Sequence, residues 1–150
     1  MRIVIQRVSR ASVQIEDGPP EAIGPGLVVL VAIARNDTEK DAGFLVAKLA
    51  GLRIFPDQQG KMNLSLLETG GELLIVSNFT LYGDCRKGRR PSFDRAAAPE
   101  RARVLYDYFV ECARKTCPVV RTGVFQAHMS VQIDNLGPVT LICNSNSEED

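Results

Sequence analysis

Eight consecutive apolar residues, Leu27 to Ala34, are the feature that most limits how this chain can fold. A Val, Leu and Ile run of this length is typical of a strand covered on both faces, because a strand with one face in water alternates apolar and polar residues. The run is too short to cross a bilayer as a helix, which needs about 20 apolar residues. We therefore expect a buried central strand.

The rest of the chain shows strand and helix patterns. Alternation of apolar and polar residues predicts half-buried strands. Thr38 with Asp41 predicts a capped helix start, and Pro99 suits the first position of a second main helix. The predicted strands are 2–7, 11–16, 27–34, 54–55, 72–81, 129–133 and 139–143. This order predicts one α/β domain, and it is not of the Rossmann type because no glycine-rich nucleotide motif follows a strand.

Length, charge and cysteine content narrow the class of protein. The 150 residues suit one domain, and 18 Lys and Arg balance 18 Asp and Glu, which argues against binding long nucleic acid through overall charge. The four cysteines are far apart and there is one histidine, so neither a zinc site nor a disulfide framework is expected. The first sixteen residues alternate and lack the apolar core of a signal peptide. We expect reduced cysteines in a cytosolic protein.

Residues 77–80, at the end of predicted strand 72–81, are the first candidate for chemistry. Ser77 and Thr80 offer hydroxyl groups, but a hydroxyl nucleophile needs a base, and the single histidine, His128, has no placement that the sequence reveals. Alternatively, these are ordinary polar residues at a strand end, or their backbone N–H groups form a cradle for an oxyanion. All three interpretations stay open on the pattern alone.

Two further segments could contribute to a site. Gly137-Pro138 lies in a turn and can hold a cis bond that aims two carbonyls to one side, although an ordinary hairpin turn explains it as well. Residues 86–95 carry five basic side chains and suit a short stretch of RNA, unless they are only a solvated surface. Arg7 is either a surface charge or a partner for backbone carbonyls, and Met129 is either core or pocket wall.

Five segments together closely resemble the D-aminoacyl-tRNA deacylase family. The resemblance runs in the same order from Met1 to about Leu141. The segments are IQRVSRASV (5–13), GKMNLS (60–65), VSNFTL (76–81), RPSF (90–93) and NLGPVT (135–140).

This resemblance implies a single α/β domain over residues 1–144 with a three-layer α/β/β fold, mixed or antiparallel sheets and two main helices, followed by a disordered tail, 145–150. It also implies a cytosolic homodimer that hydrolyses the ester between a D-amino acid and the terminal adenosine of tRNA. Glycyl-tRNA, including tRNA-Ala mischarged with glycine, is implied as a second substrate. The resemblance implies no metal and no organic cofactor.

The resemblance also assigns roles to residues. Ser77, Asn78, Phe79 and Thr80 match the motif of one chain, with backbone N–H groups stabilising an oxyanion while the 2′-hydroxyl of the adenosine assists. Gly137 and Pro138 match a cis turn supplied by the partner chain, which receives the α-amino group and excludes L side chains by clash. Supporting and tRNA-contacting residues, in this implication, are Arg7, Phe125 and Met129, and Arg86, Lys87, Arg89 and Arg90.

Two residues depart from the family pattern. The family usually has Gln where this chain has Asn78, which shortens the side chain by about 1.5 Å. It usually has Asp where this chain has Leu136, which removes a charge beside the turn. These departures are the only support for one alternative, an RNA-binding or partner-binding module that kept the fold and lost turnover. A second alternative, independent of them, is a conventional serine or threonine hydrolase of small esters.

Overall fold

The structure, a computed structural model, describes residues 1–146. Its strands are β1 (Arg2–Ile15), β2 (Glu21–Ile23), β3 (Gly26–Ala32), β4 (Phe55–Pro56), β5 (Met62–Leu64), β6 (Glu72–Ser77), β7 (Val120–Thr122) and β8 (Met129–Asn144). Its helices are α1 (Glu39–Gly51), α2 (Leu66–Thr69), the 3₁₀ helix η1 (Phe79–Tyr82) and α3 (Pro99–Thr116). The predicted α/β class and the two main helices, α1 and α3, are confirmed.

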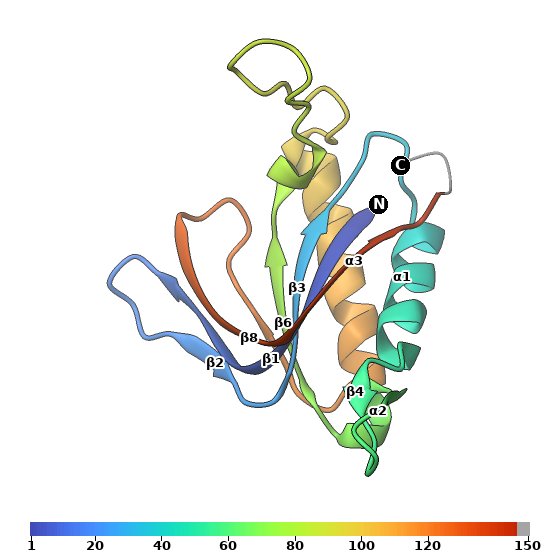
Figure 1. The fold of residues 1–150 in the computed structure, drawn as a ribbon. Coiled ribbons are helices and arrows are strands. Elements are labelled where there is room, and N and C mark those ends of the chain that lie inside the picture. The colour runs from blue at the N-terminus through green and yellow to red at the C-terminus, as the bar shows by residue number, and fades with distance from the viewer. Residues whose placement is uncertain (147–150) are drawn as a thin grey trace.

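One mixed six-stranded sheet organises the molecule (Figure 1). Along it the strand order is β2-β1-β3-β6-β7, and β8 also pairs with β1. The pairs that involve β1 are antiparallel, whereas β3 and β6, and β6 and β7, are parallel. Because β3 and β6 are parallel neighbours, their carboxyl ends meet at the same edge of the sheet.

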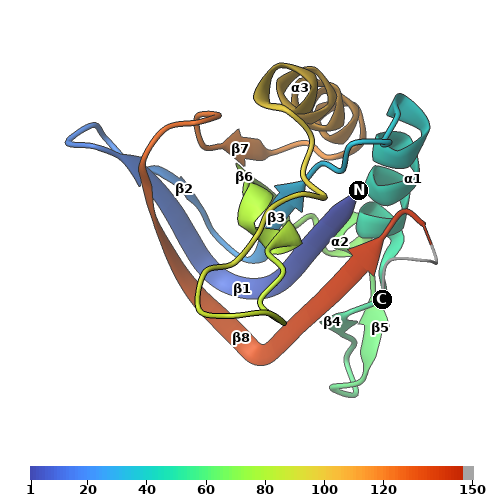
Figure 2. The same cartoon turned by 90° about the horizontal axis from the view of Figure 1, so that it is seen from above.

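Two apolar cores lie on opposite faces of the central strands. Leu73 and Ile75 of β6 belong to the core under α1 and α3, and the alternate residues Leu74 and Val76 belong to a second core. The second core is covered by the outer halves of β1 and β8, because both strands bend sharply and fold over the sheet (Figure 2). This arrangement is the α/β/β layering, and it explains why the run from Leu27 needs no polar face.

The helix starts follow from local chemistry. The Asp41 carboxylate accepts hydrogen bonds from the Thr38 N–H and hydroxyl, both at 2.8 Å, so the predicted capping pair opens α1. Pro99 is the first residue of α3, as expected. The buried face of α3 contains, among others, Leu105 and Phe109 at helical spacing.

Three predicted boundaries were wrong. Segments 2–7 and 11–16 form one strand, β1, and segments 129–133 and 139–143 form one strand, β8, which pairs with it. Gln6 pairs with Thr140 and Val8 pairs with Asn135, so β8 continues on both sides of the predicted turn. Between these pairs, residues 136–139 lie opposite the single residue Arg7 and form a bulge. Strand 72–81 ends at Ser77, since the bond from the Leu81 N–H to the Asn78 carbonyl begins a 3₁₀ turn.

Short elements escaped the sequence patterns: β2, β5, β7 and α2 each span only three or four residues. Of the predicted tail, Ser145 bonds to Met1, with its N–H 2.9 Å from the Met1 carbonyl oxygen, and residues 147–150 lie outside the described part. Among the described helices, none has both the length and the apolar character needed to cross a membrane.

Candidate active site

A cavity of about 960 Å³ opens at the carboxyl ends of β3 and β6. Its walls are the ends of these strands, the beginning of η1, the first turn of α3 and the segment before β8. Residues that line it are Val31, Ala32, Ile33, Arg35, Ser77, Asn78, Phe79, Phe93, Ala96, Ala97, Ala98, Pro99, Arg101, Ala102, Phe125, Gln126, Ala127 and Met129. The cavity is mostly apolar, as small-molecule sites usually are.

Residues 77–79 form one wall of this cavity, and Thr80 is the next residue along the chain. Asn78 is pinned to the sheet through its N–H, which donates to the Val31 carbonyl at 2.7 Å. The chain then turns into η1, and the N–H groups of Phe79 and Thr80 have no acceptor within the described residues, as expected for the first residues of a helix. The Thr80 hydroxyl donates to the Asn78 side-chain oxygen. Two backbone donors therefore remain available at this end of the cavity, one on the lining residue Phe79 and one on the next residue, Thr80.

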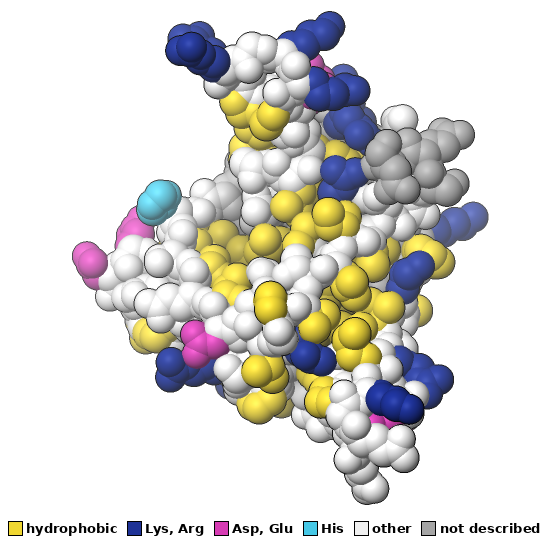
Figure 3. Space-filling view, in the orientation of Figure 1, with side chains coloured by type: hydrophobic (Ala, Val, Ile, Leu, Met, Phe, Trp, Pro, Cys, Tyr) yellow, Lys and Arg dark blue, Asp and Glu magenta, His cyan; other side chains and the backbone are white. Residues whose placement is uncertain are grey.

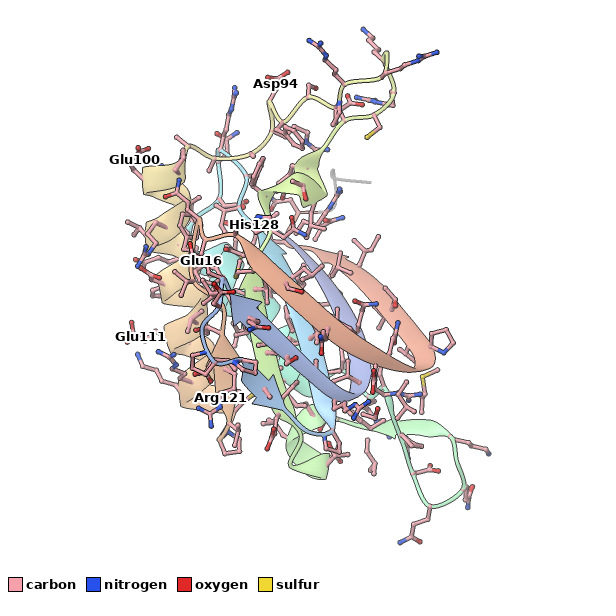
Figure 4. The ribbon with its side chains drawn as sticks, turned by 90° about the vertical axis from the view of Figure 1, so that its left-hand side faces the viewer. Glu16, Asp94, Glu100, Glu111, Arg121 and His128 are labelled. Atoms are coloured by element: carbon pink, nitrogen blue, oxygen red, sulfur yellow. The ribbon has the colours of Figure 1, made fainter. Side chains whose placement is uncertain are left out.

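No base accompanies the hydroxyl groups of this wall. The ionisable residues that line the cavity in the described chain are Arg35 and Arg101, and neither can accept a proton at neutral pH. His128 immediately precedes β8, at the same end of the molecule as Asp94 and Glu100 (Figure 4), but it is exposed and does not line the cavity. Neither Ser77 nor Thr80 thus has a partner that would make it a nucleophile.

Phe125 and Met129 both lie in the cavity wall, as the resemblance implied. The Phe125 ring is held between Tyr106, with ring centroids 5.7 Å apart, and the guanidinium of Arg103, 5.6 Å from its centroid. Tyr106 is fixed in turn because its hydroxyl donates to the Ile75 carbonyl at 3.1 Å, and burial raises its pKa. Met129 packs closely over Gly123, where a Cβ would fall 2.4 Å from its sulfur.

The turn at Gly137 and Pro138 lies elsewhere: neither residue lines the cavity of its own chain. The peptide bond between them is cis. Arg7, only 9% exposed, lies beneath this turn and donates through Nε to the Leu136 carbonyl at 3.2 Å and through Nη1 to the Ile54 carbonyl at 2.6 Å. Arg7 is therefore not a surface charge but a partner for two carbonyls.

The basic segment extends from the cavity end of the molecule, after η1 (Figure 1). Arg86, Lys87, Arg89 and Arg90 are all exposed and none lines the cavity. Arg86 pairs with Asp84 across 2.6 Å, which holds the pKa of that carboxyl well below its usual range. No three His, Cys, Asp or Glu side chains in residues 1–146 lie close enough together to hold a metal ion.

The sequence analysis missed three residues of the cavity: Arg35, Phe93 and Arg101. Arg35 had a usable signal, because it directly follows the buried run that ends at Ala34 and so stands at a strand end. Arg101 lies in the first turn of α3, and its Nη2 donates to the Asp37 carbonyl at 2.7 Å. Phe93 was predicted only as an aromatic residue within the basic segment 86–95 and not as part of a cavity.

Comparison with known proteins agrees with this geometry. Residues 4–144 match the family described as D-Tyr-tRNA(Tyr) deacylase. The chain belongs to this family. A D-aminoacyl-tRNA deacylase of Solibacter usitatus (strain Ellin6076) is 57% identical over 97% of this chain and 96% of that protein, and one of Bacillus velezensis (strain DSM 23117 / BGSC 10A6 / LMG 26770 / FZB42) is 53% identical over 97% and 99%. A solved structure titled c-Myc DNA Unwinding Element Binding Protein is 40% identical, covers 98% of this chain and 100% of that one, and has a TM-score of 0.92.

The two departures from the usual deacylase pattern lie in different surroundings. Asn78 is in the cavity wall, where its side-chain oxygen is occupied by the Thr80 hydroxyl. Leu136 is 48% exposed beside the bulge, and its carbonyl, not its side chain, contacts Arg7. In this deacylase, the backbone of each departing residue is fixed by a hydrogen bond: the Asn78 N–H donates to the Val31 carbonyl, and the Leu136 carbonyl accepts from Arg7.

Proposed function

We propose that this protein hydrolyses the ester bond of D-aminoacyl-tRNA and releases the free D-amino acid and the tRNA. Membership of the family makes it a hydrolase of the D-aminoacyl-tRNA deacylase class. The observation that carries the proposal is the start of η1, where the lining residue Phe79 and the next residue, Thr80, leave their backbone N–H groups free beside a mostly apolar cavity that no carboxylate or imidazole of the described chain lines. Such a site can stabilise charge but cannot supply a base.

The chemistry therefore uses the substrate and water. A water oxygen attacks the ester carbonyl, and the N–H groups of Phe79 and Thr80 hold the oxyanion that forms. The 3′-oxygen of the terminal ribose leaves, and the adjacent 2′-hydroxyl carries the proton between water and leaving group. The ester and one water give one carboxylic acid and one ribose hydroxyl, so no covalent intermediate with Ser77 or Thr80 is needed.

The active unit is a homodimer in which each cavity receives the Gly137-Pro138 turn of the partner chain. Two observations support it: the turn is remote from its own cavity, and the sheet near it exposes apolar side chains. Ile142 is 66% exposed, and its neighbour across the β1–β8 pair is Val4. Side chains of this kind are normally covered in a soluble protein's working assembly.

The turn selects for handedness by exclusion. Its main-chain carbonyls receive the α-amino group of a D-aminoacyl ester and fill the space into which an L side chain would project. The same filter accepts glycine, which has no side chain to clash, so glycyl-tRNA, including glycine mischarged on tRNA-Ala, is a second substrate. Arg7 steadies the turn, and Phe125 and Met129 shape the wall opposite.

The rest of the tRNA meets the basic segment, where Arg86, Lys87, Arg89 and Arg90 lie near phosphates. Because charged tRNA is used in translation, the protein acts in the cytoplasm as a proofreading enzyme. We expect the overall charge of the protein to contribute little to tRNA binding, since the chain has no net charge.

The test is hydrolysis of D-tyrosyl-tRNA and L-tyrosyl-tRNA, each with and without the 2′-hydroxyl of the terminal adenosine. We expect release of the D-amino acid only, and only when the hydroxyl is present. Binding without release would identify a binding module. Cleavage of simple esters that Ser77→Ala or Thr80→Ala abolishes would identify a conventional hydrolase, and either result contradicts the proposal.

A further inference from the structure

A closed arm, which we define as residues 84–92, stands between η1 and α3. Its ends are joined by a β-bridge in which the Asp84 N–H donates to the Ser92 carbonyl at 2.8 Å and the Ser92 N–H donates back to the Asp84 carbonyl at 3.1 Å. Arg86 adds to the closure, because its Nε and Nη2 donate to the two carboxylate oxygens of Asp84 at 2.9 and 2.6 Å. The arm is thus a closed loop with a defined base.

The base of the arm is attached to the wall of the cavity. The Phe93 ring meets the Phe79 ring edge-on, with centroids 5.1 Å apart and planes at 69°. Two residues further on, the Arg95 guanidinium lies 5.4 Å from the centre of the Tyr82 ring, and the Ala97 N–H donates to the Ile33 carbonyl at 2.9 Å. The direction in which the arm projects is therefore set by residues that line or border the cavity.

The tip of the arm carries three cations that are not used within the chain. Lys87, Arg89 and Arg90 are exposed, and none has a hydrogen-bond or ion-pair partner among residues 1–146. Figure 3 shows dark-blue side chains gathered around this projection. In a chain with no net charge, three unpaired cations on one closed loop are a local binding feature for an extended anion.

An exposed aromatic ring lies between these cations and the cavity. Phe79 lines the cavity, yet 58% of it remains exposed although one side meets Phe93. Proteins that hold single-stranded nucleic acid combine cations along the backbone with aromatic rings on which bases stack. Here the ring and the arm follow each other along one path that leads out of the cavity.

We propose that the arm and the Phe79 ring together hold the unpaired 3′ strand of the RNA. Lys87, Arg89 and Arg90 contact its phosphates, and the Phe79 ring stacks on the base of the nucleotide that precedes the terminal one. This inference rests on the proposed function, because an ester on a terminal adenosine inside the cavity forces the preceding nucleotide out past Phe79 and Phe93. The part of the RNA that the arm contacts is thus the single strand and not the paired stem.

The test compares D-tyrosyl esters of adenosine, of the trinucleotide CCA and of a minihelix that ends in CCA. We expect kcat/KM to rise about tenfold from the adenosine ester to the trinucleotide ester. Variant Lys87→Gln/Arg89→Gln/Arg90→Gln should lose most of this gain. With the trinucleotide ester its salt dependence should flatten by about 1.4 in the log–log slope, since CCA has two internucleotide phosphates and each phosphate contact on a single strand contributes about 0.7. Phe79→Leu should reduce the ratio of trinucleotide to adenosine ester about tenfold.

The matched control removes the same number of positive charges from residues outside the arm. Lys40→Gln/Lys48→Gln/Arg114→Gln neutralises three exposed cations on α1 and α3 and should leave the ratio unchanged. Anisotropy of a fluorescent uncharged CCA trinucleotide gives a second readout that needs no hydrolysis. Here the arm variant should bind about tenfold more weakly than the control.

Three results would overturn the inference: a gain that appears only with the minihelix, which places the arm on the duplex; equal kcat/KM for all three esters; or equal trinucleotide binding by the arm variant and the control. Equal cleavage of the three esters would leave the proposed hydrolysis standing. If no ester is cleaved but the arm variant binds the trinucleotide more weakly than the control, the proposed hydrolysis is rejected and the strand contact is supported.

Discussion

The chain leaves regular strand structure at two functionally important places, and the two are built differently. At 77–80 it ends a buried parallel strand and turns into η1, which leaves free N–H groups on Phe79, a lining residue of the cavity, and on Thr80. At 136–139 it bulges out of the long edge strand β8, remote from that cavity, and is held from below by Arg7. The first segment lines a cavity of its own chain, whereas none of residues 136–139 lines that cavity.

This difference teaches where each half of the site receives its rigidity. The wall at 77–80 is fixed by the central sheet, for example through the Asn78 N–H and the Val31 carbonyl. The bulge depends on one buried side chain, because Arg7 joins the carbonyls of Leu136 and Ile54. Damage to the bulge should therefore be local and severe, whereas polar side chains of the wall should be replaceable.

The largest effect is expected from Gly137→Ala. Gly137 has a φ of 120°, and an added Cβ would lie 2.8 Å from Arg7 Nη2 and 3.0 Å from Val139 Cγ2, so the turn must move. A shift of about 1 Å in a positioning element costs on the order of 100-fold in rate. We expect kcat/KM for D-tyrosyl-tRNA to fall at least about 100-fold with an unchanged far-ultraviolet circular dichroism spectrum. Leu136→Ala, at the exposed neighbour, is the control, and equal activity of the two variants would contradict this account of the bulge.

Arg7→Lys should come next. A lysine can reach only one of the two carbonyls, so one buried acceptor loses its partner at a cost of about 1–3 kcal/mol. We expect the free energy of unfolding to drop by about that amount and kcat/KM to fall about tenfold. Urea denaturation and the same hydrolysis assay measure the two effects. If the free energy of unfolding drops by the expected amount while kcat/KM stays unchanged, Arg7 supports the fold and not the turn.

Ser77→Ala and Thr80→Val should have small effects, within about fivefold in kcat/KM. The backbone donors stay in place in both variants, and neither hydroxyl has a base beside it. Removal of a true hydroxyl nucleophile costs on the order of a million-fold. Single-turnover hydrolysis separates the two cases, and a loss above about 10⁴-fold in either variant would establish a nucleophile.

The smallest change is expected from Asn78→Gln, which restores the residue usual in the family. The longer side chain can still accept from the Thr80 hydroxyl, and the backbone bond to Val31 is unaffected. We expect kcat/KM within about twofold of the unmodified protein. A tenfold gain would show that the amide itself contacts the substrate.

The sequence patterns predicted which segments are buried better than how they connect, and the three layers were implied by the family resemblance alone. The apolar run from Leu27 and the stripe of α3 specify burial, which depends on composition over several residues. The continuity of β8 could not be foreseen, because Gly137-Pro138 resembles a strand break and only pairing with β1 on both sides shows it to be a bulge. The register of two paired strands depends on both strands together, so the sequence of either strand alone does not predict it.

The same limit applies to the candidate site. Ser77 and Thr80 were candidates because of their hydroxyl groups, whereas the proposed chemistry uses the free N–H groups of Phe79 and Thr80, which no side-chain pattern encodes. Residues 77–79, Phe125 and Met129 converge on one cavity because the carboxyl ends of β3 and β6 lie near the start of β8. Nothing in the individual segments predicts that convergence, nor the remoteness of Gly137 from it.

The central claim is that a cavity from one chain is completed by the turn of another, and mixing two inactive variants tests it most directly. Gly137→Ala damages the turn and leaves the cavity intact, whereas Ala127→Trp fills the cavity and leaves the turn intact. After subunit exchange, half of the dimers combine both chains, and each of these has one intact site. The account predicts recovery to about a quarter of the unmodified activity from two nearly inactive preparations. An equally mixed, exchanged sample that stays inactive would contradict it.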